Sequence, residues 1–430
     1  MSFFLFLPGL RRLPLPLPLR LPHTAMSEST ALFSTKVLTC DPSTISFPPS
    51  SDNPQFSKES TLRALKVAAS HLIDDAQTVV FPTETVYGLG ALALHPSASA
   101  KIFSTKGRPP DNPLIVHVSS LSMLRSLLPT TYVIPKSYSL LISHFWPGPL
   151  TLLFPRNPDI VPALITANQP TVAIRMPSHP VARALIAVAH SPLAAPSANT
   201  SGKPSPTKAE HVFQDLNGKV PLILDGGPCN VGLESTVVDG LHNDGHIRIL
   251  RPGGITVEDI ESVFRLHAHD FPNIPKVLVH KRDYTDEKIE AVPTTPGMKY
   301  RHYSPSVPVI LLLTRPSLSQ LDPPTSFSDY IHSFRKSSGY GRSIMGVLAP
   351  TDSNLWPAVD AIKDILWLRY PLGPLTEPNV IAHNLFDGLL SLEKDGVELI
   401  FIEEIDEARE GLAIMNRVRK ASSKNIRIQL

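Results

Sequence analysis

The stretch KESTLRALKVAASHLIDDAQTVVFPTETVYGLG, residues 58–90, decides the fold class of this 430-residue chain. Its first half repeats apolar residues at helical spacing over residues 58–76, and Ser60 is the expected N-cap. The apolar run Val79–Phe81 then predicts a short buried strand that ends at Pro82. A helix that leads directly into a buried strand is typical of an α/β protein.

The same alternation continues along the chain and divides it into parts. Short strands and helices joined by turns rich in Gly, Pro, Ser and Thr predict an α/β domain over residues 58–268. Residues 269–306 are charged and turn-rich, and they are too long for an ordinary connection, so we predict a linker or a functional loop. Apolar strand and helix patterns restart over residues 307–430 and predict a second, smaller α/β domain of doubly wound type. The strands expected after Phe81 are residues 114–118, 151–154, 172–175, 222–224, 235–239, 247–250, 309–313, 344–349 and 398–402. The helices expected after residue 76 are residues 97–105, 121–128, 136–145, 180–189, 207–215, 256–265, 379–394 and 412–421.

Composition excludes several classes of protein. The chain has 40 Lys and Arg against 38 Asp and Glu, which argues against binding nucleic acid by bulk charge alone. Its two cysteines, Cys40 and Cys229, rule out a disulfide scaffold and show no zinc-binding spacing. The 45 prolines exceed the usual share of about 5%, but abundant Val, Leu and Ile distinguish the chain from a disordered one.

We predict that residues 1–57 form a disordered N-terminal extension, because prolines break any helix in the first 25 residues and residues 27–56 are polar. The first 25 residues carry Arg but no acidic residue, and their positive charges follow the apolar start rather than precede it. No stretch reaches the roughly 18–20 apolar residues that a membrane helix needs, so we expect no stable membrane association. Two readings stay open: an extension upstream of an alternative start at Met26, or a mitochondrial transit segment on an otherwise cytoplasmic protein.

Polar side chains gather in four places where predicted strands end, and ligands tend to bind at strand ends in open α/β sheets. The four clusters are FPTETVYGLG (81–90), KGRPPDNPLIVHV (106–118), TVAIRMPSHP (171–180) with LAAPSANTSGKPSPT (193–207), and GLESTVVDG (232–240) with RILRPGG (248–254).

Cations and hydroxyls in these clusters suit anionic ligands. Lys106 and Arg108 stand close together before rigid prolines, as phosphate binding requires. Arg175 ends an apolar strand, where its charge needs either a ligand carboxylate or an acidic partner, and both alternatives stay open. The small donors between Ser197 and Ser205 suit phosphate or nucleotide oxygens, or they form an ordinary surface loop. His117 lies in mid-strand, where a histidine is more often structural.

Competing chemistries lack their motifs. The chain shows no GxSxG elbow, no HExxH, no P-loop and no GxGxxG fingerprint. What remains is a set of groups that bind and position anions, with no recognisable protein nucleophile and no protein-held metal.

The ordered motifs FPTETVYGLG, KGRPPDNPLIVH, WPGPLT, TVAIRMP, APSANTSGKPSPT, LESTVVD and RPG resemble those of the YrdC-like threonylcarbamoyl-AMP synthases. PGMKYRHYSP and REGLAIMNRVRKAS resemble the long, two-domain form of that family. The resemblance implies a YrdC-like twisted open mixed sheet with flanking helices around a concave site, followed by a smaller Rossmann-like C-terminal domain. It also implies synthesis of L-threonylcarbamoyladenylate and pyrophosphate from L-threonine, bicarbonate and ATP, for modification of tRNA.

By resemblance, each motif residue takes a role. The KxR and SxN pairs of the family, implied to be catalytic, correspond here to Lys106, Arg108, Ser197 and Asn199. The residues implied to bind threonine are Thr85, His117, Arg175, Ala195 and Ser235. The residues implied to bind ATP are Arg108, Asn112, Thr171, Ser197, Ser205, Arg251 and Tyr303. The linker, with Tyr300, His302 and Tyr303, is implied to cover the site as a lid.

The resemblance further implies Mg²⁺ carried by ATP, a tRNA contact, and a downstream threonylcarbamoyl-transferase complex as the recipient of the product. We expect the C-terminal domain to control the lid or to mediate assembly. Two alternatives remain: an RNA-binding YrdC-like module, which the near-neutral charge disfavours, and a carbamoyltransferase-related enzyme, whose zinc-finger and acylphosphatase-like segments this chain lacks.

Overall fold

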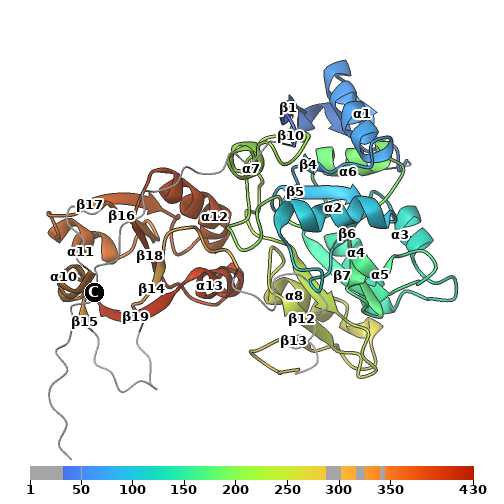
Figure 1. The fold of residues 1–430 in the computed structure, drawn as a ribbon. Coiled ribbons are helices and arrows are strands. Elements are labelled where there is room, and N and C mark those ends of the chain that lie inside the picture. Colours follow the sequence, from blue (N-terminus) through green and yellow to red (C-terminus); the bar gives the residue numbers. More distant parts are fainter. Residues whose placement is uncertain (1–31, 50, 287–301, 316–324, 339–343) are drawn as a thin grey trace, which may run out of the picture. The chain divides into compact units, whose positions relative to one another are not determined.

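The computed structural model describes residues 32–49, 51–286, 302–315, 325–338 and 344–430. Most of the strands and helices expected from the sequence are present, with ends shifted by a residue or two. Two sheets of very different size carry the fold (Figure 1).

The larger sheet is mixed and has eleven strands in the described part of the chain. Its strands are, along the chain, β1 (Lys36–Thr39), β4 (Val79–Phe81), β5 (Gly88–Leu92), β6 (Val116–His117), β7 (Leu150–Pro155), β8 (Thr171–Arg175), β9 (Leu193–Ala194), β10 (Leu222–Asp225), β11 (Thr236–Asp239), β12 (Ile247–Arg251) and β13 (Val277–Val279). They are ordered β1-β10-β4-β5-β9-β6-β8-β7-β11-β12-β13. The helices around them are α1 (Glu59–Ile73), α2 (Pro96–Lys106), α3 (Leu121–Leu127), α4 (Lys136–Phe145), α5 (Ala163–Thr166), α6 (Pro180–Val188), α7 (Ala209–Leu216) and α8 (Val257–Leu266). This arrangement confirms the expected open mixed sheet with flanking helices.

Helix α1 and strand β4 form where the apolar pattern predicts them. The apolar face of α1 is buried and packs against α6 and the sheet, and all three residues of β4 are buried. The expected cap is wrong: Lys58 is the N-cap residue, and Ser60 already lies in the first helical turn. Strand β5 was not expected, because glycines disfavour strands. Gly90 is needed there, since a Cβ atom would lie 2.4 Å from the Phe81 ring.

Residues 32–57 do not form the disordered extension that their composition predicts. Strand β1 pairs in parallel with β10, and Cys40 is fully buried beside it. A 3-10 turn (Pro42–Thr44) and the small β2–β3 pair, Ile45–Ser46 with Gln55–Phe56, follow. Strand β1 is an edge strand with little buried surface, so it lacks the apolar alternation that reveals a strand.

The expected linker also begins later than predicted. Strand β13 pairs in parallel with β12, so the larger sheet continues past residue 268. A short 3-10 turn, Ala268–Asp270, joins α8 to this strand. The predicted lid falls largely on residues 287–301, including Tyr300, which lie outside the described residues.

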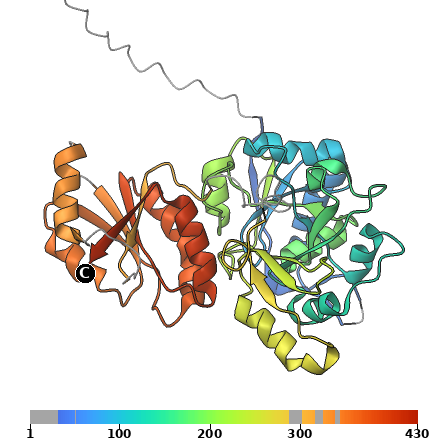
Figure 2. The same cartoon turned by 90° about the horizontal axis from the view of Figure 1, so that it is seen from below.

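The smaller sheet is entirely parallel and confirms the expected Rossmann-like second domain. Its described strands are β14 (Val309–Leu313), β15 (Thr325–Ser326), β16 (Ile344–Ala349), β17 (Leu366–Pro371), β18 (Leu399–Glu403) and β19 (Lys424–Gln429), ordered β15-β19-β14-β18-β16-β17. Its helices are α10 (Phe327–Ser338), α11 (Leu355–Ala361), α12 (Pro378–Lys394) and α13 (Glu410–Ala421). Helices cover both faces of this sheet (Figure 2). A separate cluster of buried apolar side chains lies between each face and its helices, with α12 and α13 on one cluster and α10 and α11 on the other. Strands β17 and β19 were missed because Arg, Lys and Asn interrupt their apolar runs.

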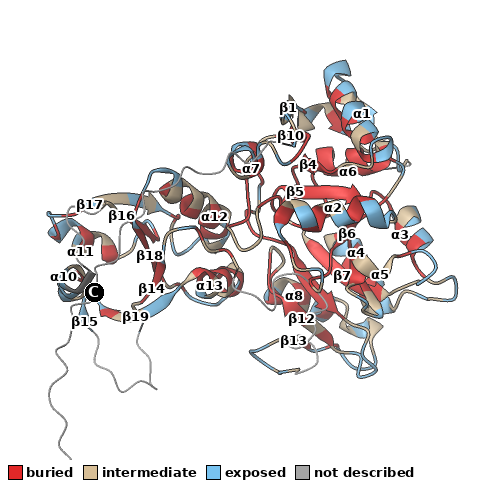
Figure 3. Ribbon diagram, viewed as in Figure 1, coloured by how far each residue is buried: buried red, intermediate tan, exposed pale blue. Residues whose placement is uncertain are grey.

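The central strands of both sheets are buried, whereas strands at the sheet edges, such as β1 and β17, and the outer faces of the helices are largely exposed (Figure 3). Many polar residues are nevertheless buried at strand ends, and these belong to the clusters singled out in the sequence. None of the helices in the described ranges is both long and apolar enough to span a bilayer.

Candidate active site

A pocket lies at the ends of β4, β6, β8 and β12 and at the start of β11, and all four polar clusters contribute residues to its wall. It encloses about 580 Å³ of space, part of it open to solvent. The lining residues are Thr83, Thr85, Val86, Gly88, Arg108, Ile115, His117, Arg175, Ala195, Pro196, Ser197, Glu234, Ser235, Arg251, His302 and Tyr303. Residues from 83 to 303 therefore meet at one place.

The turn between β4 and β5 is built by its own threonine. The Thr83 hydroxyl accepts hydrogen bonds from the amides of Thr85 and Val86, each at 3.2 Å, and donates to the Val86 carbonyl at 2.7 Å. This serine/threonine-type turn holds Thr85 at the mouth of the pocket. The segment also pairs with the 193–207 cluster, since the Leu89 amide donates to the Pro196 carbonyl at 2.9 Å.

Gly107 gives the two cations of the KxR motif different directions. Helix α2 ends at Lys106, and Gly107 caps it in the left-handed region at φ 60°, a conformation that favours glycine. Lys106 thus stays on the helix, whereas Arg108 leaves it and reaches the pocket wall.

Lys106 supports the pocket from behind rather than lining it. Its ammonium donates to the backbone carbonyls of Ser197 and Asn199, and the side chain is almost fully buried. Burial, followed by the nearby charge of Arg108, holds the pKa of Lys106 well below its usual value. Lys106 therefore ties the KxR motif to the SxN motif through main-chain oxygens.

Arg108 is a buried cation held by carbonyl groups. Its Nε donates to the Asn112 carbonyl at 3.2 Å and its Nη2 to the Pro113 carbonyl at 2.9 Å. Burial and the charge of Arg251 lower the pKa of Arg108 to about 9, which leaves it charged at neutral pH. The ion pairs of Arg175 with Glu84 and of Arg417 with Glu234 do not include Arg108, whose described hydrogen bonds go to carbonyl groups.

Arg175 has an acidic partner, which answers the alternative that the sequence left open. Its Nη2 lies 3.0 Å from Glu84 Oε2, and its Nη1 donates to the Thr85 hydroxyl at 3.0 Å. The Arg175 Nε and the Glu84 Oε1 are buried without hydrogen-bond partners among the described residues. The guanidinium thus keeps one buried donor in the pocket wall.

His117 is a neutral wall residue. It sits in β6 beside β8, and its Nδ1 lies 3.1 Å from the Ile115 carbonyl. Burial and the positive charge of Arg175 lower the pKa of His117 to about 3. The imidazole is therefore uncharged at neutral pH and contributes shape and a ring nitrogen.

Ser235 links strand β7 to the end of β12. Its hydroxyl lies 2.7 Å from that of Thr151 on β7, and its carbonyl accepts from Arg251 Nη2 at 2.8 Å. Arg251, at the end of β12, is buried, and burial lowers its pKa. Arg175 thus donates to Thr85, and Arg251 donates to Ser235, while Arg108 lines the same pocket.

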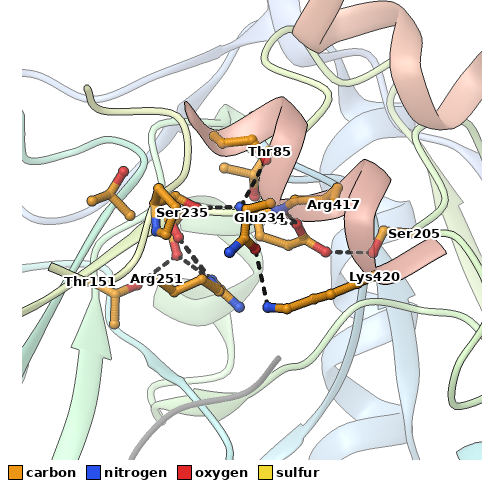
Figure 4. Close-up of polar contacts among 12 residues, drawn as sticks. Thr85, Thr151, Ser205, Glu234, Ser235, Arg251, Arg417 and Lys420 are labelled. Atoms are coloured by element: carbon orange, nitrogen blue, oxygen red, sulfur yellow. Dashed lines mark hydrogen bonds and ion pairs between the residues drawn. The ribbon is translucent and has the colours of Figure 1, made fainter. Parts of the chain in front are cut away.

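Sequence reasoning missed Glu234 and its partner Arg417. Figure 4 shows Arg417 and Ser205 approaching the carboxylate of Glu234. The Ser205 hydroxyl donates to Oε1 at 2.7 Å, and two guanidinium nitrogens of Arg417 donate to Oε2 at 2.9 and 3.1 Å. Burial alone would raise the pKa of Glu234, but Arg417 and Arg251 outweigh it and lower that pKa to about 2. The motifs LEST and NRVRK contained both residues, but no local pattern joined them.

Five of the predicted site residues do not line the pocket: Lys106, Asn112, Thr171, Asn199 and Ser205. Asn112 contributes its carbonyl to Arg108, and Asn199 donates to the carbonyls of Thr200 and Lys203. Thr171 begins β8 while Arg175 ends it, so at about 3.3 Å per residue the two lie on the order of 13 Å apart. Thr171 therefore lies outside the lining of this pocket, and its role in ATP binding stays a prediction.

His302 and Tyr303 are the described part of the expected lid, and both line the pocket. Tyr303 has a left-handed backbone at φ 66°, which is strained for an aromatic residue. Its ring lies 5.3 Å from that of Phe386, centroid to centroid, and beneath the Arg417 guanidinium at 5.7 Å. Residues of the C-terminal domain thus hold this side chain against the pocket.

Within the residues placed by the structure, no group of three or more His, Cys, Asp or Glu side chains is arranged to hold a metal ion. The carboxylate that lines the pocket, Glu234, already has both oxygens occupied. The donor set therefore fits a cation that arrives coordinated to phosphates better than one held by a protein cage.

Two protein families match adjoining parts of the chain. The Sua5–YciO–YrdC family, described as telomere recombination, matches residues 71–253. The family described as the C-terminal domain of threonylcarbamoyl-AMP synthase matches residues 255–423. Fold and site together thus define a two-domain protein of the YrdC type.

Relatives of full length identify the family. The threonylcarbamoyl-AMP synthase of Schizosaccharomyces pombe is 42% identical over 418 aligned residues, covering 90% of this chain and 98% of the relative. That of Bacillus subtilis is 41% identical, covering 83% of this chain and 93% of the relative. The crystal structure of Pyrococcus abyssi Sua5 complexed with L-threonine aligns with a TM-score of 0.68 at 35% identity, covering 92% of this chain and 100% of that one. The chain belongs to the threonylcarbamoyl-AMP synthase family.

Proposed function

We propose that this protein is a threonylcarbamoyl-AMP synthase that acts as a nucleotidyltransferase on L-threonine, bicarbonate or CO2, and ATP. The observation that carries the proposal is the placement of two separate cationic groups in one pocket: Arg175 with Thr85, and Arg108 with Arg251. An amino acid carboxylate suits the first group and a phosphate chain the second. A P. abyssi relative of similar fold was solved with L-threonine, which supports the first assignment.

The reaction that fits this pocket has two bond-forming steps. The threonine amine attacks the carbon of CO2, forms a C–N bond and loses a proton, which gives a carbamate. A carbamate oxygen then attacks the α-phosphorus of ATP, a P–O bond forms, and the bond to the β-phosphate oxygen breaks with release of pyrophosphate. Neither step needs a covalent bond to the protein, in keeping with a pocket of cations, hydroxyls and a neutral histidine.

The side chains of the pocket act through position and charge. Arg175 and Thr85 would hold the threonine carboxylate and orient its amine, and His117, Ala195 and Ser235, which line the same pocket, would complete the threonine site. Arg108 and Arg251 would neutralise charge on the phosphate oxygens, with Ser197 and Tyr303 beside them. Mg²⁺ that arrives with ATP would add charge neutralisation on the phosphate chain. Lys106 would keep the Ser197–Asn199 backbone in place for this half of the pocket.

Threonine-dependent pyrophosphate release tests the function. The full chain is incubated with ATP, Mg²⁺ and bicarbonate, and pyrophosphate is measured with L-threonine, with D-threonine, and with no amino acid. We expect release with L-threonine alone, and we expect excess EDTA to stop it without lowering the melting temperature of the protein. Release that does not depend on L-threonine contradicts the proposal.

We also propose the setting of the reaction: a cytoplasmic enzyme whose product passes to a threonylcarbamoyl-transferase complex for tRNA modification. The near balance of 40 basic and 38 acidic residues supports a small-molecule enzyme over an RNA-binding module. Titration with tRNA at several salt concentrations tests this choice. Tight binding with a steep salt slope, and no pyrophosphate release, would favour the RNA-binding alternative. Imaging fusions begun at Met1 and at Met26 tests the localisation.

A further inference from the structure

Helix α13 of the C-terminal domain places a charged side chain against the pocket of the other domain. The Arg417 side chain is fully buried, and its partner Glu234 is 11% exposed. The two residues are 183 positions apart in the sequence. A buried arginine at this position is costly unless its donors are satisfied, so its partners show what it does.

Apart from the Ala413 carbonyl of its own helix, 3.4 Å from Nη1, the hydrogen-bond partners of Arg417 belong to segments next to Ser235 and Arg251, in the half of the pocket that faces the proposed nucleotide. Two of its nitrogens meet Glu234 Oε2, and Nη1 donates to the carbonyl of Pro252, directly after Arg251. Its guanidinium also covers the ring of Tyr303. One side chain therefore touches the LEST segment, the RPG segment and the end of the linker.

Charge is the main consequence of this contact. Glu234 lines the same pocket as Arg108 and Arg251, and it is ionised. A bare carboxylate at this position would repel the phosphates of a nucleotide. Arg417 on one oxygen and the Ser205 hydroxyl on the other occupy both, so Glu234 is left neither as a free negative charge nor as a general base.

We propose that Arg417 is a positioning residue of the nucleotide half of the site, supplied by the C-terminal domain to neutralise Glu234 and to hold Tyr303. The inference rests on the proposed function for the identity of the nucleotide. Threonine binding, which relies on Arg175 at the other part of the pocket, does not depend on Arg417.

Four variants of the full chain separate charge from packing. Arg417→Met removes the positive charge with similar length, Glu234→Gln removes the negative one, and the double variant removes both. Arg417→Lys keeps the charge but loses the planar fork. Lys394→Met is the matched control, because Lys394 also pairs across to the first domain, with Glu210 at 2.6 Å, on the exposed surface.

Isothermal titration with a non-hydrolysable ATP analogue, and separately with L-threonine, gives the readout. We expect Arg417→Met to weaken analogue binding by about 30-fold or more, because it leaves a buried charge unpaired, and to leave threonine binding within about 3-fold. The double variant should recover analogue binding to within about 5-fold of the wild type. Lys394→Met should bind both ligands as the wild type does.

Three results would overturn the inference. The first is equal weakening of both ligands by Arg417→Met, which would show general loss of packing. The second is a double variant that binds the analogue no better than the single one. The third concerns Arg417→Lys and applies even if Arg417→Met fails to fold: a loss above about 30-fold would show that neutralisation is not the role, because lysine retains the charge.

A failure of the proposed function can be distinguished from a failure of the inference about Arg417. A wild-type protein that binds the analogue but releases no pyrophosphate with L-threonine refutes the synthase assignment, while the pattern of analogue binding among the variants still decides the role of Arg417.

Discussion

Replacing Arg175, alone and together with Glu84, separates structural support from ligand binding. Arg175 and Glu84 form a buried pair whose side chains are 3% and 7% exposed, with a 3.0 Å contact. Arg175→Met leaves the Glu84 carboxylate buried without its cation, which should cost about 3–5 kcal/mol of unfolding free energy. In the double variant Arg175→Met/Glu84→Gln both charges are gone. The remaining loss is about 1–2 kcal/mol, from two hydrogen bonds. Urea unfolding followed by circular dichroism measures both values.

The KM for threonine should not follow the order of stabilities, because the double variant regains stability but still lacks the Arg175 guanidinium. Arg175 Nε is a buried donor without a partner among the described residues, and the guanidinium lies in the pocket wall. Each charge-assisted hydrogen bond to a carboxylate contributes about 1.5–3 kcal/mol, a factor of about 10–150 in affinity. We therefore expect the threonine KM in the pyrophosphate assay to rise at least 10-fold in both variants, with the ATP KM within about 3-fold of wild type.

The double variant distinguishes ligand binding by Arg175 from a purely structural role. Recovery of stability without recovery of threonine use supports ligand binding by Arg175. If the double variant regains a normal threonine KM, Arg175 serves only as the counter-ion of Glu84. An equal rise in the KM values for threonine and ATP would likewise refute the reasoning.

Three further predictions concern His117 in the pocket wall and two residues outside it, Lys106 and Gly253. The pKa of His117 falls from 6.5 to about 3 on folding, so the unfolded state takes up the proton first and stability is lost as pH falls below 6.5. His117→Gln should therefore remove about 2 kcal/mol of the stability difference between pH 7 and pH 5, measured by urea unfolding, and an unchanged difference would contradict a neutral buried imidazole. Lys106→Met should lower kcat at least 10-fold, because the serine–asparagine loop loses the two hydrogen bonds that Lys106 donates to its carbonyls. Lys203 pairs with a carboxylate beside the same loop, and the control variant Lys203→Met should keep kcat within about 3-fold of the wild type. Gly253→Ala should destabilise the protein by about 3 kcal/mol or more in thermal unfolding, because the added Cβ would lie 2.2 Å from a backbone oxygen. Gly245→Ala, at φ 71° in open space, should cost about 1 kcal/mol. Equal losses of stability in the two variants would refute the steric clash at Gly253.

Elements with strong local periodicity were predictable. Strands β14 and β16 begin and end where their apolar runs do, and α12 differs from its expected start by one residue. Strands β1 and β13 were not, because short strands at or near a sheet edge gain their stability from one neighbour rather than from an apolar face. Both strands were placed in segments whose composition suggested a tail or a linker.

The residues of the candidate site likewise fall into those that the sequence predicted and those that it did not. The side chains in the motifs predicted Arg108, Arg175 and Arg251 as anion-binding residues, and all three line one pocket. The sequence also showed that Arg175 needed a partner, but it did not name Glu84, because ion pairing depends on distance in space. Thr171 was assigned to the site by resemblance alone, and it is not among the residues that line the pocket.

The amino-acid sequence by itself determined the α/β class, most of the elements, and the cationic character of the site, since these follow from local periodicity and side-chain chemistry. The tertiary structure decided which charges compensate one another: Glu84 with Arg175 across 91 positions, and Glu234 with Arg417 across 183. The physical reason is that a buried charge is stabilised only by groups within a few ångströms, and such neighbours come from segments that are remote along the chain.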